Sequence, residues 1–147
     1  MTQIVRSIAQ YCQDNLIQAI LEGKKLRAEQ YHIQVSYEIF LPDKLSIEIT
    51  DLCSVFFNLM DNAIEACGKI GGHKVIDIKL NVQQGYQFIS ISNPTNEEND
   101  NLETTKDDKI HHGFGINNIR NAVNRHNGTI DINNGNGLFC LNITLKL

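Results

Sequence analysis

Five polar side chains lie on one stripe of an otherwise apolar helix that the sequence predicts over residues 52–67. At about 100° per residue they fall within an arc of roughly 100°; they are Ser54, Asn58, Asp61, Asn62 and Glu65. Their amide and carboxylate oxygens can coordinate a hard cation and hydrogen-bond to phosphate or water. A half-buried helix with an Asn-rich outer face would show the same pattern. The stripe alone therefore leaves a binding and a structural interpretation open.

Two glycines one residue apart, Gly113 and Gly115, stand directly ahead of a second helical pattern. Glycine lets a backbone approach a ligand closely, and the free N–H groups at the start of a helix can bind an anion. The helical pattern is marked by Ile116, Ile119, Ala122 and Val123, and it ends at Asn127-Gly128. A lone G-x-G often marks only a tight turn, and this one matches neither the P-loop nor the dinucleotide-binding fingerprint.

The elements that must position these residues indicate an α+β fold. A helical pattern covers residues 2–31, and alternating apolar residues predict strands over residues 33–41, 75–82, 86–93, 129–133 and 138–147. Turns at residues 83–85 and 134–137 predict hairpins between consecutive strands, the second from the sequence Asn-Gly-Asn-Gly. We expect a two-layer sandwich, in which helices cover one face of a mixed, mostly antiparallel sheet.

Composition narrows the possible classes of protein. A chain of 147 residues that is 41% hydrophobic can bury one core. The net charge of −4 argues against a nucleic acid or an anionic membrane as a partner. The sequence contains no apolar run long enough to span a bilayer and no signal peptide, so we expect a cytoplasmic domain without direct membrane contact. Its four cysteines form no C-x-x-C pair, which makes a disulfide or metal site an unfavoured interpretation.

The two motifs together resemble the GHKL superfamily of ATP-binding domains, which have the Bergerat fold. Residues 58–63 match the family's N-x-x-x-N-A box, and residues 113–116 match its G-x-G-[LI] box. The longer strings NLMDNAIEA and HGFGINNIR resemble quorum-sensing histidine kinases that respond to peptide pheromones. Residues 20–33 resemble the segment that joins the dimerisation helices of that subfamily to the ATP-binding domain. The resemblance covers nearly the whole chain.

The resemblance implies a Mg²⁺–ATP site on the first motif. The family counterpart of Asn62 binds Mg²⁺ through its side-chain oxygen, and one amide suffices because water and phosphate oxygens complete the coordination. Asn58 stands where gyrase-like members have a Glu that activates water, and an amide cannot take up a proton at neutral pH. We expect Asn58 to contact ATP and to serve catalysis together with Glu65, although Glu65 is equally compatible with a solvated helix acid. Asp61 is expected to be structural.

The second motif and the strand before it complete the ATP site that the resemblance implies. The expected ATP-binding residues there are His112, Gly113, Phe114, Gly115 and Asn118. Most members also carry a D-x-G-x-G box, whose Asp accepts a hydrogen bond from the adenine amino group. This sequence has Asn93-Pro94 at that point. Asn93 could accept the same hydrogen bond, but a neutral acceptor binds more weakly than a carboxylate, so weak ATP binding is compatible with the sequence.

The resemblance also implies how the chain is divided. Residues 1–31 are expected to be the end of the dimerisation region and its connector, and residues 32–147 the ATP-binding domain. Residues 94–109 lack periodicity and are rich in Asn, Thr and acids, which is typical of a loop. The resemblance implies a lid over the nucleotide at about residues 94–112.

None of the histidines is suited to accept a phosphoryl group, because none lies within the first helix or beside an acid; they are His32, His73, His111, His112 and His126. We therefore expect the phosphoacceptor on an upstream helix or on a second chain. A response regulator and a homodimer in a membrane-anchored, full-length sensor are the other expected partners.

Three functions remain open from the sequence. The first is the ATP-binding catalytic domain of a two-component sensor histidine kinase. The second is another GHKL enzyme, either an anti-sigma-type serine kinase or a gyrase-like ATPase, and Asn58 in place of Glu counts against both. The third is a degenerate, non-catalytic interaction module, which the absence of the Asp box keeps possible.

Overall fold

The computed structural model describes residues 8–41, 45–96 and 106–147, and the side chains within residues 15–41, 45–96 and 115–147. Its helices are α1 (Ile8–Gln30), α2 (Ile49–Gly68) and α3 (Lys106–Arg125). Its strands are β1 (Ile33–Ile39), β2 (Lys74–Gln83), β3 (Tyr86–Pro94), β4 (Thr129–Gly135) and β5 (Leu138–Lys146). Every predicted strand is present, with ends that lie within two residues of the predicted ones.

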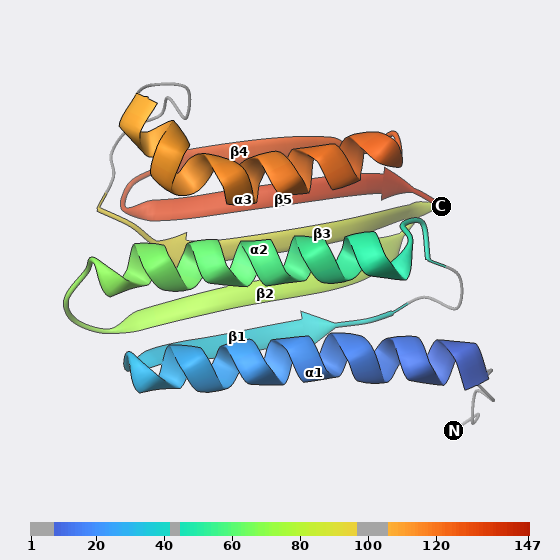
Figure 1. Cartoon of the computed structure of the whole chain (residues 1–147), viewed down its shortest axis with the longest axis horizontal. Coiled ribbons are helices and arrows are strands. Elements are labelled where there is room, and N and C mark those ends of the chain that lie inside the picture. The colour runs from blue at the N-terminus through green and yellow to red at the C-terminus, as the bar shows by residue number, and fades with distance from the viewer. Residues whose placement is uncertain (1–7, 42–44, 97–105) are drawn as a thin grey trace.

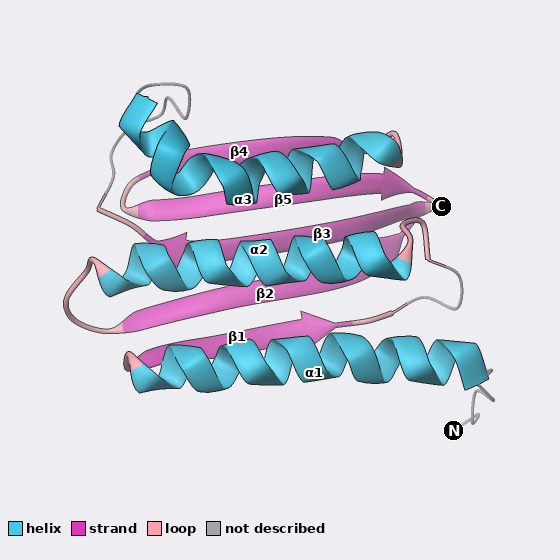
Figure 2. Ribbon diagram, viewed as in Figure 1, coloured by secondary structure: helices cyan, strands magenta, loops and turns pink. Residues whose placement is uncertain are grey.

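The strands form one sheet in the order β1-β2-β3-β5-β4. β1 and β2 pair in parallel and are joined through α2, since parallel neighbours need a crossover connection. The other neighbouring pairs are antiparallel. All three helices lie on the same face of the sheet, with α2 between α1 and α3 (Figures 1 and 2). The predicted α+β fold, a mixed and mostly antiparallel sheet covered on one face, is confirmed.

Both hairpins close through two-residue turns with positive φ. Gln84 and Gly85 (φ 52° and 84°) join β2 to β3, and Asn136 and Gly137 (φ 57° and 77°) join β4 to β5. Positive φ at both central positions is the geometry that continues the right-handed twist of the flanking strands, and Asn-Gly adopts it at low cost. These local turns fix the register of both hairpins.

The core lies between the sheet and the helices. In β2, β3 and β5 alternate residues are buried, which directs one apolar row of each strand toward the helices. The buried residues of α2 are Leu52, Val55, Phe56, Leu59, Met60, Ala63, Ile64 and Cys67. Leu147, the last residue of the strand predicted over 138–147, continues the apolar alternation of β5, but it is 50% exposed because it lies beyond the end of that strand.

Helix α1 shares this core. Ile17, Leu21 and Ala28 belong to the same buried cluster as the residues of α2 and the sheet. Lys24 Nζ lies 2.5 Å from Asp61 Oδ1 and 3.5 Å from the centroid of the Phe57 ring. The predicted boundary between residues 31 and 32 therefore does not divide two cores, because α1 needs the domain to cover its apolar face. The origin of α1 in a dimerisation region stays a prediction.

Helix α3 differs from the sequence-based expectation at its start. We predicted a loop up to residue 112 and a helix after the glycines, but α3 begins at Lys106, so that Gly113 and Gly115 lie inside it. Residues 106–112 contain no proline or glycine to stop a helix. Glycine inside a helix is tolerated at a cost of about 1 kcal/mol relative to alanine. Residues 97–105 of the predicted lid lie outside the described residues.

The end of α3 is a close-fitting turn. Asn127 has φ 56°, its N–H donates to Asn124 O at 3.1 Å, and the Gly128 N–H donates to Val123 O at 3.0 Å. These two bonds satisfy carbonyls that a helix end would otherwise leave unpaired. A Cβ on Gly128 would lie 2.4 Å from Leu145 Cδ2 and 2.8 Å from Thr144 O, which explains why glycine stands there.

Candidate functional site

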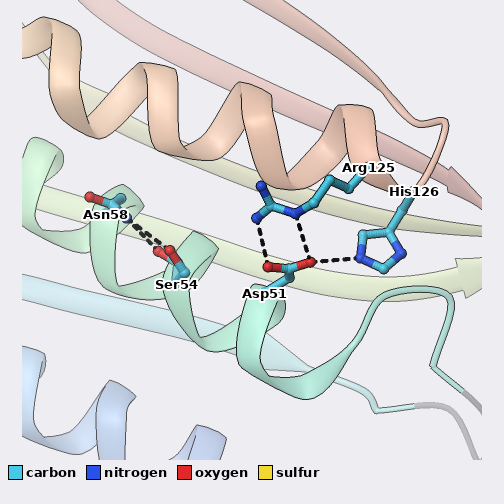
Figure 3. Close-up of polar contacts among 5 residues, drawn as sticks. All are labelled: Asp51, Ser54, Asn58, Arg125 and His126. Atoms are coloured by element: carbon cyan, nitrogen blue, oxygen red, sulfur yellow. Dashed lines mark hydrogen bonds and ion pairs between the residues drawn. The ribbon is translucent and has the colours of Figure 1, made fainter.

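The two sequence motifs meet where α2 packs against α3. The Asn58 side-chain amide donates through Nδ2 to Ser54 O at 2.7 Å and to Ser54 Oγ at 3.3 Å, so that its orientation is fixed (Figure 3). Its oxygen faces the other helix, because a Cβ added to Gly115 would lie 3.7 Å from Asn58 Oδ1. Residues that are 57 positions apart in the chain are thus neighbours in the fold. An acceptor oxygen and a side-chain-free backbone form one wall of the candidate site.

The other residues of the polar stripe differ in burial and in their partners. Asn62 is half-buried one turn after Asn58, whereas Glu65 is exposed. Asp61 faces away from α3 and pairs with α1, through Lys24 Nζ at 2.5 Å and Arg27 Nη1 at 3.0 Å. Asp61 therefore anchors one helix to another, while the role of Asn62 as a cation ligand stays a prediction.

Asn93 supplies a buried acceptor at the end of β3. Its residue is 1% exposed, and its Nδ2 donates to Pro94 O at 3.0 Å. Its Oδ1 is buried without a hydrogen-bond partner among the described residues. Leaving a buried acceptor unsatisfied costs about 1–3 kcal/mol, and binding of a ligand is one way in which this cost is recovered. The free oxygen fits a ligand that brings an N–H donor, as the adenine amino group does.

The remaining predicted ATP-binding residues are only partly described. Gly113 lies within α3, and Asn118 is exposed on the same helix. The side chains of His112 and Phe114 lie outside the described ones, so their predicted contacts stay predictions.

No group of three or more His, Cys, Asp or Glu residues in the described part of the chain could hold a metal ion. A Mg²⁺ ion bound to one amide, with phosphate oxygens and water as its other ligands, does not require such a group. Within the described residues, no helix is long and apolar enough to cross a membrane.

A hollow of about 360 Å³ lies on the face of the sheet that carries no helix. None of the predicted site residues lines it; its lining is Ser36, Glu38, Asp77, Lys79, Ser90, Ile91, Ser92, Cys140 and Asn142. These are mostly the short polar side chains of the solvated strand rows, and they offer no link to either motif. The hollow is therefore separate from the candidate site.

One polar cluster of the α2–α3 pair was not anticipated from the sequence. Asp51, in the first turn of α2, contacts Arg125 and His126 at the end of α3 (Figure 3). Hydrogen bonds from Arg125 and His126 hold the pKa of the Asp51 carboxyl below its ordinary value. From the sequence, His126 is considered only as a phosphoryl acceptor, for which it is unsuited. An acidic residue at the start of one helix and two basic residues at the end of another are common in sequences. The sequence alone therefore gives little indication that they are in contact.

Comparison with known proteins gives three results. Residues 47–146 match the family model described as GHKL domain. No curated protein matches the chain. Among solved structures, the nucleotide-free catalytic domain of histidine kinase ThkA matches with a TM-score of 0.71 and 21% identity, over 90% of each chain.

Two further histidine kinases are similar in fold. AdeS from Acinetobacter baumannii matches with a TM-score of 0.65 and 16% identity, over 90% of this chain and 64% of its own. A blue-light activated histidine kinase from Erythrobacter litoralis matches with a TM-score of 0.63 and 13% identity, over 91% of this chain and 40% of its own. At these identities the likeness concerns the fold, whereas the family model covers most of the chain: the chain belongs to the GHKL domain family.

Proposed function

We propose that this chain is the ATP-binding catalytic domain of a sensor histidine kinase, which transfers the γ-phosphoryl group of ATP to a histidine outside residues 1–147. The observation that carries the proposal is the meeting of Asn58 and Gly115 across α2 and α3, together with the free, buried Oδ1 of Asn93. One end of this arrangement suits phosphate and Mg²⁺, and the other suits the adenine base.

In this proposal Asn93 recognises the base. Its Nδ2 is engaged by Pro94 O, so the side chain presents Oδ1 as an acceptor. An acceptor is complementary to the exocyclic amine of adenine and not to the exocyclic oxygen of guanine. The hydrogen bond would be weaker than one to a carboxylate, which is why we expect modest affinity and a preference for ATP over GTP.

The phosphate end requires α3 to change. Within a helix the N–H groups of Gly113 and Gly115 are engaged by carbonyls one turn earlier. Those N–H groups become available to phosphate only if the first turns of α3 unwind. Two glycines lower the helical stability of that segment. We infer that nucleotide binding shortens α3 from its N-terminus and so creates a new helix start, where N–H groups and the helix dipole favour an anion.

The reaction type follows from Asn58. Its amide is neutral and cannot act as a general base, so hydrolysis by this chain should be slow. Phosphoryl transfer depends mainly on positioning and charge stabilisation. Asn62 would hold Mg²⁺, and Glu65, exposed on the same stripe, would orient its outer ligands.

The remaining parts of the proposal concern the longer protein. We infer membrane anchoring, a homodimer, a response regulator and a role in peptide-pheromone quorum sensing from the resemblance of residues 20–33 and of the two motifs. His32 and His73 are exposed at the ends of elements, and His126 is engaged by Asp51. The side chains of His111 and His112 lie outside the described ones, and we infer, as from the sequence, that the acceptor lies outside residues 1–147.

A titration with Mg·ATP and with ATP in EDTA tests the site. Asn62→Ala should weaken Mg-dependent binding by about 10- to 100-fold, the usual effect of losing a metal ligand or a group that orients one. Asn81→Ala, which removes an exposed amide from β2, is the matched control and should bind like the wild type. Unchanged Mg·ATP binding by folded Asn62→Ala protein would refute the site assignment. Failure of the wild type to bind would favour the non-catalytic interaction module.

A further inference from the structure

The first turn of α2 and the end of α3 are joined by a three-residue cluster, which we call the Asp51 clamp (Asp51, Arg125 and His126). Arg125 donates from Nη2 to Asp51 Oδ1 at 2.7 Å and from Nε to Asp51 Oδ2 at 3.3 Å. His126 Nε2 lies 2.8 Å from Asp51 Oδ2. The side chains of Asp51 and His126 are 17% and 16% exposed and that of Arg125 is 57% exposed, so the carboxylate of the clamp is shielded from water while the guanidinium is largely open to it.

The clamp has a defined geometry. A guanidinium that binds both carboxylate oxygens fixes direction as well as distance, which a single point charge would not. The charges also suit the helix ends: Asp51 lies near the positive end of the α2 dipole, and Arg125 lies near the negative end of the α3 dipole. Glu48 adds favourable charge near Arg125. The cluster therefore restrains both sliding and rotation of α2 along α3.

The face of α2 that carries Asp51 also carries the residues proposed to bind the nucleotide. On a helix with about 100° per residue, Asp51, Asn58 and Asn62 lie within roughly 40° of one another. α2 and α3 run antiparallel, since Asp51 meets Arg125 while Asn58 meets Gly115. Gly115 has no side chain to interlock with α2, so packing at that point cannot set the axial position by itself. Figure 3 shows the clamp and Asn58 along the same side of α2.

We propose that Asp51 and Arg125 are positioning residues for nucleotide binding: they set the axial and rotational position of α2 against α3 and thereby hold Asn58 and Asn62 opposite the glycine segment. The inference rests on the proposed function but concerns residues that do not touch the nucleotide. A purely stabilising ion pair would lower the free energy of unfolding and leave the affinity of the folded protein unchanged. A positioning pair changes the affinity of the folded protein.

Asp51→Asn and Arg125→Lys test the inference. Asp51→Asn keeps the size and removes the charge, whereas Arg125→Lys keeps the charge and removes the two-pronged contact. Asp131→Asn, at an exposed carboxylate of β4, is the matched control. The Kd for Mg·ATP is measured by calorimetry well below each unfolding transition, and the backbone amide signal of Gly115 is followed by NMR without nucleotide.

We expect Asp51→Asn to raise the Kd about tenfold, the lower end of the range for groups that orient metal ligands, and to shift the Gly115 amide signal. Arg125→Lys should have a smaller effect in the same direction, and Asp131→Asn none. A folded Asp51→Asn protein with wild-type Kd overturns the inference, whatever its stability. If the wild type itself does not bind Mg·ATP, the proposed function fails. In that case the Gly115 amide signal alone tests whether the clamp positions α2 against α3. An unshifted signal in Asp51→Asn then overturns the positioning role.

Discussion

At the scale of the residue, the unpaired side-chain oxygen of Asn93 allows a direct test of base recognition. Its Oδ1 is buried and has no hydrogen-bond partner among the described residues, while Nδ2 is held by Pro94 O. The folded protein therefore keeps a desolvated acceptor that a ligand with an N–H donor can satisfy. A carboxylate at this point would bind adenine more strongly but would also bury a charge in the absence of nucleotide. The amide gives weaker recognition at a lower cost to the unliganded fold.

Asn93→Ala tests this role of the Asn93 oxygen. The lost oxygen has no partner among the described residues, but the substitution also removes the Nδ2 hydrogen bond to Pro94 O, so the free energy of unfolding should fall by about 1 kcal/mol. ATP binding should weaken by about three- to tenfold, the value of one neutral hydrogen bond. The preference for ATP over GTP should fall as well. Parallel titrations with both nucleotides measure this, and an unchanged ATP/GTP ratio would exclude Asn93 from base recognition.

At the scale of the element, α3 shows a conflict between local propensity and proposed function. A helix with two glycines in its first half is weaker there than its length suggests. The second half is better secured, because Ile119, Ala122 and Val123 are fully buried and the end is capped by the turn at Asn127. The helix therefore has a firm C-terminal half and an N-terminal half that can unwind at low cost.

Gly115→Ala tests that asymmetry. Among the described residues, an added Cβ would meet only Asn58 Oδ1, at the ordinary contact distance of 3.7 Å, so no steric clash with them is expected. Alanine should stabilise the unliganded helix by about 1 kcal/mol. Mg·ATP affinity should fall, since the helix becomes harder to unwind and the backbone less accessible to phosphate. Urea unfolding and calorimetry measure the two effects. Equal losses of stability and of affinity would mean that the glycine is purely structural.

At the scale of the whole molecule, the chain shares its fold with part of two solved histidine kinases, of which it spans 64% and 40%. The open face of the sheet carries polar residues, and the helical face carries the candidate site. A phosphoacceptor would therefore have to approach from the helical side.

Residues 1–147 alone should hydrolyse ATP very slowly and should not label themselves with phosphate. A longer protein that includes the upstream helix should label a histidine there, giving an acid-labile and base-stable phosphate, because the acceptor is then brought in line with the γ-phosphate. Radiolabelled ATP, with Asn62→Ala as the inactive control, measures both reactions. Rapid hydrolysis by the short chain would instead indicate a gyrase-like ATPase, and base-labile labelling of a serine would indicate the serine-kinase alternative.

The sequence by itself determined the parts of this protein that depend on near neighbours. Strand positions follow from alternating apolar residues, as in β2 and β5, because a period of two needs no information from elsewhere in the chain. The Asn136-Gly137 turn is equally local. The two motifs could be located in the same way, and with them the family.

Only the tertiary structure decided which distant residues meet. The contacts of Asn58 with the Gly115 segment, of Asp51 with Arg125 and of Asp61 with Lys24 join helices that lie far apart in the chain. The burial of α1 in the common core and the start of α3 at Lys106 could not be predicted from local sequence patterns either. The physical reason is the same in each case: helix packing is set by the shared core and by a few charged contacts across it, whose energies depend on three-dimensional proximity and not on spacing along the sequence.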